Sequence, residues 1–245
     1  MNTSMRLVGF VLWLLGAAAA PAQSLTRDQV AARIAAGSKD FSNLEAPGAD
    51  LSELDFTEAN LFGANLKGAD LSNAKLARSN LSVAILRDAV LIGADLREAK
   101  MFSSVFANAN LQGADLRGAQ LVGNFERANL ADANLERVKG GADMRNQPMG
   151  LVRLVLTGAR LNGARLRGAD LSRADLSFAY LSGADLTGVD LTQAKLVGAD
   201  LRDSTLSHAT FNGAEIHNAI FTGAKDVDTV RGLDDADGRE TATFD

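Results

Sequence analysis

A five-residue period runs through most of the chain and constrains the fold more than any other feature. Large apolar residues recur at every fifth position from 51 to 121, where all fifteen are Leu, Phe or Met, and from 156 to 221, where all fourteen are Leu, Ile or Phe. We call each five-residue repeat a word. Ala stands two positions before the large residue in 12 of the fifteen words of the first run and in 11 of the fourteen words of the second. The exceptions are Leu54, Ser79, Ser104, Leu154, Val189 and Ser204.

This period fits neither a helix nor a continuous strand, whose side chains repeat about every 3.6 and every 2 residues. A helix would carry the large residues around all of its sides, and a strand would send successive ones to opposite faces. The chain must therefore turn in every word, and we predict a solenoid of stacked coils. The large residue fills the interior, Ala points inward where little volume remains, and the other three positions face water.

The words resemble the consensus of the pentapeptide repeat family. Ala64-Asn65-Leu66-Lys67-Gly68 and Ala169-Asp170-Leu171-Ser172-Arg173 are two examples, and the resemblance covers about residues 41–225. It implies an all-β solenoid, the right-handed quadrilateral β-helix, with four words in each coil. Residues 20 apart would then share one column along the solenoid.

The first 22 residues have the pattern of an export signal. Arg6 precedes an apolar run from Leu7 to Ala20, and Ala20-Pro21-Ala22 has the small-x-small form of a cleavage site. A run of this length is short for a membrane span. We expect cleavage after Ala22, no stable membrane span in the mature chain, and a periplasmic or secreted protein; an uncleaved anchor is the alternative.

A short helix is predicted over 25–37, within the lead-in segment 23–48. Thr26 and Gln29 have capping-box spacing, Leu25 and Val30 have hydrophobic-staple spacing, and Gly37 fits a helix stop. Because the open end of a solenoid exposes apolar side chains and unpaired backbone, we expect this helix to cover the first coil.

The repeats divide into two arrays, 49–135 and 156–225. One residue is missing after Leu121, because the next large residue, Phe125, follows four positions later. Between 136 and 155 the pattern fails, which predicts a loop or bulge. Beyond the second array, Val227, Val230 and Leu233 are expected to close the last coil, and the acidic segment 226–245 is expected to end in a mobile tail.

The sequence offers little for catalysis. It has no Cys and only two His, His208 and His217, which face outward on different columns. Asp and Asn recur before the large residue, where they are expected to bond the backbone at the corners. A convex rod provides no water-poor concavity that would separate carboxyl pKa values. We therefore predict no enzyme activity, no cofactor and no metal site.

Six apolar residues are predicted to converge on one outward edge. Phe62, Phe102 and Val122 share a column, and Val83, Ile85 and Val105 lie on the columns beside it. An exposed apolar patch often marks a docking surface. Two alternatives remain open here: another chain docks on this edge, or the 136–155 loop or the N-terminal segment covers it.

The middle of the chain is basic, although the net charge of the whole chain is −5. Residues 137–173 hold only two acids, Asp143 and Asp170, and eight basic residues, which we call the basic waist: Arg137, Lys139, Arg145, Arg153, Arg160, Arg165, Arg167 and Arg173. Arg pairs well with carboxylates and phosphates, so the waist is a candidate site for an anionic partner. A solvated surface that only aids solubility is the alternative.

These features favour an exported, non-catalytic interaction or scaffold protein of the cell envelope that binds a protein partner. The alternative follows from the resemblance: some pentapeptide repeat proteins are similar to duplex DNA in shape and charge, bind gyrase, and confer quinolone resistance. The basic waist and the export signal disfavour that function. Nucleic acid is not favoured as a partner, since no aromatic residues interleave the basic ones. The short acidic C-terminal segment favours a monomer over a homodimer.

Overall fold

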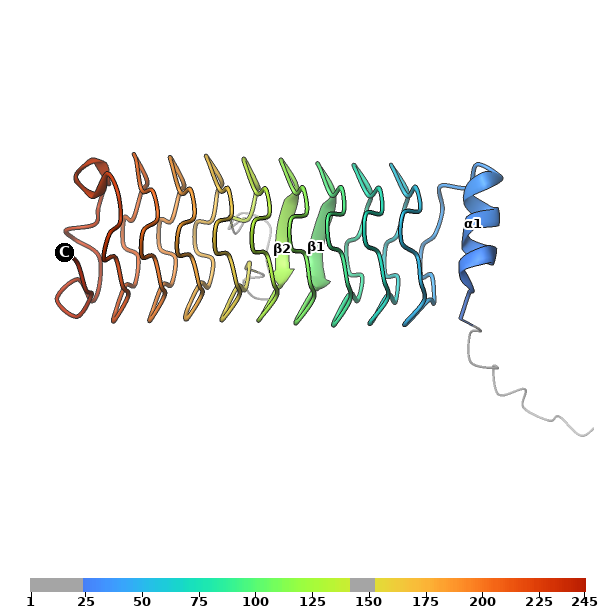
Figure 1. The fold of residues 1–245 in the computed structure, drawn as a ribbon, viewed down its shortest axis with the longest axis horizontal. Coiled ribbons are helices and arrows are strands. Elements are labelled where there is room, and N and C mark those ends of the chain that lie inside the picture. Colours follow the sequence, from blue (N-terminus) through green and yellow to red (C-terminus); the bar gives the residue numbers. More distant parts are fainter. Residues whose placement is uncertain (1–23, 142–152) are drawn as a thin grey trace, which may run out of the picture.

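The chain forms an elongated solenoid in the computed structural model, which describes residues 24–141 and 153–245. The described backbone winds in coils along one axis, with α1 at one end of the rod and the C-terminus at the other (Figure 1). Strands β1 and β2 lie side by side near the middle.

Helix α1 spans Arg27–Ala35 and is fixed by its first residues. The Thr26 hydroxyl accepts a hydrogen bond from the Gln29 amide, and the Gln29 side chain accepts one from the Thr26 amide at 2.9 Å. Val30 is fully buried against the coils, and Gly37 adopts a φ of +80° just after the helix. The Arg27 guanidinium reaches Asp50 Oδ1 at 2.8 Å and the Ser52 carbonyl at 2.9 Å, which holds the helix to the first coils.

Parallel β-bridges connect successive coils, and along most of the rod they join residues 20 positions apart. They fall into four columns, which we call A to D. Column A begins with Asp40, Asn60 and Asn80; column B with Glu45, Asn65 and Ile85; column C with Asp50, Asp70 and Val90; column D with Asp55, Lys75 and Asp95. The first bridged coil thus begins at Asp40, earlier than the predicted start of the array at residue 49.

Each word makes one straight segment and one corner. The second residue after the large apolar one usually has a positive φ. It is most often a Gly such as Gly68 (φ +64°) or a polar residue such as Glu53 (φ +62°), but Val83 and Phe178 also adopt this conformation. The Asp or Asn before the large residue accepts a hydrogen bond from the amide two positions on, as Asp70 does from Ser72 at 2.9 Å. These local bonds stabilise the corner and explain why Asp and Asn recur there.

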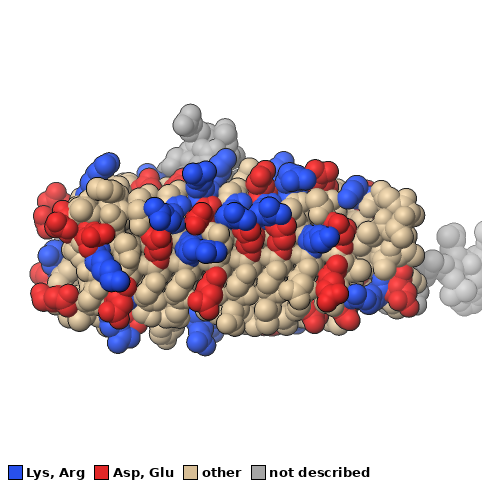
Figure 2. Space-filling view, turned by 45° about the horizontal axis from the view of Figure 1, so that its top comes forward, with Lys and Arg blue, Asp and Glu red and all other residues tan. Residues whose placement is uncertain are grey.

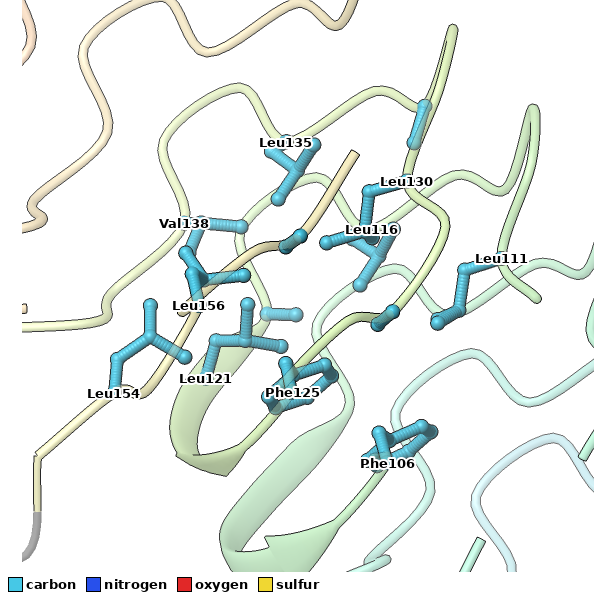
Figure 3. Packing of buried hydrophobic residues seen from close by; sticks show 14 of the residues in the cluster. Phe106, Leu111, Leu116, Leu121, Phe125, Leu130, Leu135, Val138, Leu154 and Leu156 are labelled. Carbon is cyan, nitrogen blue, oxygen red and sulfur yellow. The ribbon is translucent and has the colours of Figure 1, made fainter. Parts of the chain in front are cut away.

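The large residues and the alanines fill the interior, as the sequence predicts, and almost all of them are fully buried. Like side chains stack from coil to coil, with Phe125 over Phe106 at a ring-centroid distance of 4.6 Å (Figure 3). Ser occupies three of the Ala positions. The hydroxyls of Ser104 and Ser204 donate to carbonyls three residues earlier, whereas the Ser79 hydroxyl has no hydrogen-bond partner among the described residues.

The missing residue after Leu121 is absorbed at the corner between columns A and B. There β1 (Lys100–Val105) pairs in parallel with β2 (Gln120–Asn124), and the register shifts between Phe102 and Ser104. The next bridges join residues 19 apart, such as Asn110 and Asn129. One residue has therefore been removed from this coil, as predicted. Gly123 is needed here because a Cβ would meet the Ser104 backbone.

The interruption is shorter than the predicted 136–155 loop. Val138 is buried and Lys139 bridges both Gln120 and Asp170, so the coil continues beyond 136. Leu154 is fully buried and Val155 bridges Asn124 from 31 positions away. Val138 and Leu154 both occupy the inward Ala position of a word: Leu154 stands two residues before Leu156, as the repeat pattern indicates, whereas Val138 lies inside the predicted loop and was not expected to be buried. The centre of the predicted loop, 142–152, lies outside the described residues.

The C-terminal segment is part of the solenoid, so the prediction of a mobile tail from Asp234 to Asp245 is wrong. A short 3-10 turn, η1, spans Val227–Thr229. Bridges then join Arg231, Asp237 and Thr243 to columns A, B and C. Leu233 is buried, and Phe244 stacks on Phe221 at 4.7 Å. These apolar contacts close the last coil at irregular spacings that do not follow the five-residue period.

Within the described residues, no helix has the length and apolar character needed to cross a membrane.

Candidate interaction surfaces

The apolar edge lies on the corner between columns A and B. Phe62, Val83, Ile85 and Phe102 are exposed there by 42–47% of their surface. Val105 and Val122 are half-buried, because the local strand pairing draws them against neighbouring coils. The sequence therefore identified the residues of this edge, and four of the six present most of its apolar surface.

The interruption begins and ends on this same corner. The described chain stops two residues after Lys139 of column A and resumes two residues before Val155 of column B. A cavity of about 320 Å³ lies at this point, lined by Ser103, Ser104, Val105, Gly123, Asn124, Arg153 and Val155. The apolar edge and the interruption are thus neighbours along one corner of the rod.

The basic waist encircles the rod and does not form one patch. Lys139 belongs to column A, Arg160 to column C and Arg165 to column D. Figure 2 shows Lys and Arg interleaved with Asp and Glu over one face of the rod. Two waist residues lie near carboxylates, with Arg153 at 3.7 Å from Asp175 and Arg167 at 3.7 Å from Asp185. Of the remaining members, Arg137 and Arg173 adopt positive φ at corners, and Arg145 lies outside the described residues.

A third surface lies on column C, and the sequence analysis did not find it. Phe178 and Tyr180 are the two most exposed large apolar or aromatic residues of the described chain, at 60% and 50%. They border a groove of about 640 Å³ lined by Arg127, Gly158, Arg160, Asn162, Phe178, Tyr180, Ser182, Asp200 and Arg202. The signal was present in the sequence, because both aromatics stand at outward positions of the second array, where polar residues are usual.

The acidic residues with lowered pKa values are bonded within their own corners. Side-chain hydrogen bonds from Arg97 lower the pKa of Asp95, and those from Arg202 lower the pKa of Asp200. Burial would raise the pKa of Asp115, but hydrogen bonds from Arg117 hold it below its ordinary value. A carboxyl group that serves as general acid near neutral pH needs a raised pKa. These carboxyl groups have lowered pKa values, and their hydrogen bonds stabilise the corners of the rod.

The two His are also engaged locally. His217 Nε2 lies 3.4 Å from Asp237 Oδ2, and the His208 amide donates to the Thr229 hydroxyl at 2.9 Å. Within residues 24–141 and 153–245, no group of three or more His, Cys, Asp or Glu side chains is arranged to hold a metal ion.

Comparison with known proteins agrees with the repeat pattern. The sequence profile described as pentapeptide repeats matches in eight copies, at residues 40–73, 64–101, 103–139, 151–188 and 184–223. No curated protein sequence matches the chain.

Several solved structures are similar to this one. HetL from the cyanobacterium Nostoc sp. strain PCC 7120, a pentapeptide repeat protein involved in heterocyst differentiation regulation, is 30% identical with a TM-score of 0.56; the match covers 89% of this chain and 98% of HetL. Full-length QnrB1, a plasmid-mediated fluoroquinolone resistance protein, is 18% identical with a TM-score of 0.45 over 84% of this chain and 89% of its own. A pentapeptide repeat protein of the Arabidopsis thaliana thylakoid lumen is 24% identical with a TM-score of 0.27, over 66% of this chain and 68% of its own.

The β-solenoid, the repeating Ala and Leu of its interior and the matched repeats lead to one assignment: this chain belongs to the pentapeptide repeat family.

Proposed function

We propose that the protein is a non-catalytic interaction module that works in the cell envelope after export. The observation that carries this proposal is the apolar edge, where four large apolar side chains are exposed side by side on one corner of a regular rod. Monomeric proteins rarely leave contiguous apolar surface in water unless a partner uses it. Family members are in general structural or interaction modules, which agrees with a role without catalysis.

The same proposal includes the finer shape of the scaffold. We take the coils to be right-handed and four-sided, as the family resemblance implies, with α1 as the cap of the first coil. The spacing of 20 residues between bridges supports four words in each coil. The burial of Val30 and the contacts of Arg27 with Asp50 and Ser52 support the capping role.

Export rests on residues 1–22, which lie outside the described residues. Their charged start, apolar run and small-x-small site are typical of a signal peptide. Cleavage after Ala22 would leave Gln23 as the mature N-terminus, close to the start of α1 at Arg27.

Topoisomerase protection remains the second candidate, because the repeat pattern is interrupted between 136 and 155, and some gyrase-binding members of the family need loops at such interruptions. Two observations oppose it. The basic waist places positive charge on columns A, C and D, so the rod does not have the uniform negative charge of duplex DNA. The export signal would also remove the chain from the compartment that holds gyrase.

Photo-cross-linking in cells tests the interaction function. A photoreactive phenylalanine analogue replaces Phe102 on the apolar edge in full-length protein, and a control replaces Lys67, an exposed residue at the same position of its word on another corner of the rod. We expect a defined adduct with one protein from position 102 and none from position 67.

The N-terminus of the same purified sample is read by mass spectrometry to test export. A start at Gln23 in the envelope fraction supports the proposal. Intact Met1 in the cytosol, with gyrase as the adduct, would favour the second candidate, and the absence of any adduct from position 102 would contradict docking on the edge.

A further inference from the structure

The groove on column C combines exposed aromatic rings with positive charge. We call it the Phe178 groove; its lining residues are given above. Phe178 is held over the next coil, because its ring lies 2.8 Å from the point where a Cβ on Gly198 would be. Gly198 has a φ of +64°, so a Gly at this corner both permits the turn and leaves room for the ring. The aromatic wall of the groove is therefore fixed by packing and does not depend on a ligand.

A second Gly in the same row of corners, Gly158, forms the floor of the groove, and Arg127 forms its other wall. Gly158 has no side chain, and the aliphatic stem of Arg127 lies over it, 3.6 Å from the position of a Cβ. The gap between Arg127 and Phe178 opens above Gly158 and continues to Tyr180 on column C. An apolar side chain of a partner would fit this gap and contact the Phe178 ring.

The polar groups of the groove favour an anion. Three Arg and one Asp line it, and the Asp is already neutralised: Asp200 is 9% exposed and receives two hydrogen bonds from Arg202, at 2.8 and 2.6 Å. Arg127 is 74% exposed and lies 3.7 Å from its nearest carboxylate, Glu126. Arg160 forms no ion pair with any residue in the described part of the chain. The groove thus presents net positive charge beside its aromatic wall.

We infer that the Phe178 groove binds an acidic peptide segment that places an apolar side chain against Phe178 and Tyr180 and a carboxylate on Arg160. Tyr and Arg are enriched among the residues that dominate protein interfaces. Arg forms strong, charge-assisted bonds with carboxylates. The inference rests on the proposed interaction function, and it names a surface and a partner chemistry that the apolar edge does not share.

The experiment selects peptides from a random phage-displayed library on the full-length protein. We expect an acidic consensus that includes an aromatic or aliphatic residue. The selected peptide is then titrated into wild-type protein and into the variants Phe178→Ser and Arg160→Glu. Loss of a central aromatic contact should weaken binding about 30-fold or more, and reversal of the charge should weaken it at least about 10-fold. Added salt should lower the affinity further.

Matched controls use Ile92→Ser and Arg87→Glu, which replace an exposed apolar side chain and reverse an exposed charge outside both the groove and the apolar edge, and these variants should bind as the wild type does. Tyr180 is the only Tyr of the chain, so protein labelled with ¹³C-tyrosine has one Tyr ring environment that reports directly on the groove. Its signal should shift on addition of the acidic peptide and stay fixed with a peptide in which Lys replaces Asp and Glu.

Three outcomes would overturn the inference: a consensus that is not acidic or no consensus at all, equal binding by the groove variants and the wild type, or concentration-dependent self-association that Phe178→Ser abolishes. The first two leave the interaction function intact if the cross-link from position 102 is still obtained. The third would assign the groove to a second copy of this chain.

Discussion

Ser79→Ala is expected to stabilise the protein, although it removes a polar group. Ser79 occupies an inward Ala position, is fully buried, and its hydroxyl has no partner in the described structure. An unpaired buried hydroxyl costs about 1–3 kcal/mol, whereas the dispersion attraction between its oxygen and each neighbouring atom is worth only about 0.1–0.2 kcal/mol. The net gain should be about 1 kcal/mol, which corresponds to about 2–4 °C in Tm for a chain of this size.

Ser204→Ala is the matched control. Ser204 is equally buried at the same position of its word, but its hydroxyl donates to the Leu201 carbonyl at 2.7 Å. Its removal should lower stability by about 0.5–1.5 kcal/mol, the net value of one hydrogen bond. The Leu201 carbonyl keeps the Ser204 amide as a donor, so no unpaired group remains.

The assay is guanidinium denaturation followed by far-UV circular dichroism. Trp fluorescence is unsuitable because the only Trp, Trp13, lies in the predicted signal segment. Midpoints are compared between variants with the same m-value. Equal destabilisation by Ser79→Ala and Ser204→Ala would refute the reasoning, because it would mean that both hydroxyls are satisfied in solution.

Three further predictions concern the corners and the core. Gly123→Ala should destabilise the protein by about 1–3 kcal/mol through overpacking, since its Cβ would meet the Ser104 backbone; an unchanged Tm would contradict the strand pairing at this corner. Leu171→Ala should cost about 2–5 kcal/mol because Leu171 is fully buried, and a loss below about 1 kcal/mol in denaturant titrations would argue against a dry interior. The pKa values of Asp95 and Asp200 are lower in the folded protein than in the unfolded chain. The folded state therefore binds fewer protons than the unfolded state in acid, and acid favours unfolding. The Tm should be steady above about pH 5 and should fall as the pH drops below about 4, through the folded pKa values. A Tm that rises on acidification in circular dichroism would contradict these ion pairs.

The period of five was enough to predict the family, the inward positions and the coil that has lost one residue. The reason is physical: each word contains its own corner bonds, so its local sequence specifies its shape. Phe62, Val83, Ile85 and Phe102 could be placed on one edge for the same reason, because a fixed register converts sequence spacing into neighbours in space.

The parts that the sequence did not predict depend on contacts outside the words. Val138 and Lys139 continue the coil past residue 136 through burial and bridges to Gln120 and Asp170, although the repeat pattern fails there. The burial of Leu233 was expected, but the stacking of Phe244 on Phe221 and the bridges of Asp237 and Thr243 were not, because these residues stand at irregular spacings. The Phe178 groove forms because Phe178 lies over Gly198 and Arg127 lies over Gly158. These contacts join residues of different coils, so the sequence of a single word does not predict them.

Every surface described above depends on the register of the coils, and the most direct test is a disulfide across the interruption. The chain has no native Cys, so Lys139→Cys with Asp170→Cys places two thiols on a bridged pair that is 31 positions apart in sequence. Neighbouring parallel strands lie about 4.8 Å apart, within the range that a disulfide spans. The control pairs Lys139→Cys with Asp175→Cys, which belongs to column B. Rapid oxidation of the first pair under mild oxidant, with the control pair remaining reduced, is the predicted result; a disulfide in the control and none in the bridged pair would contradict the register.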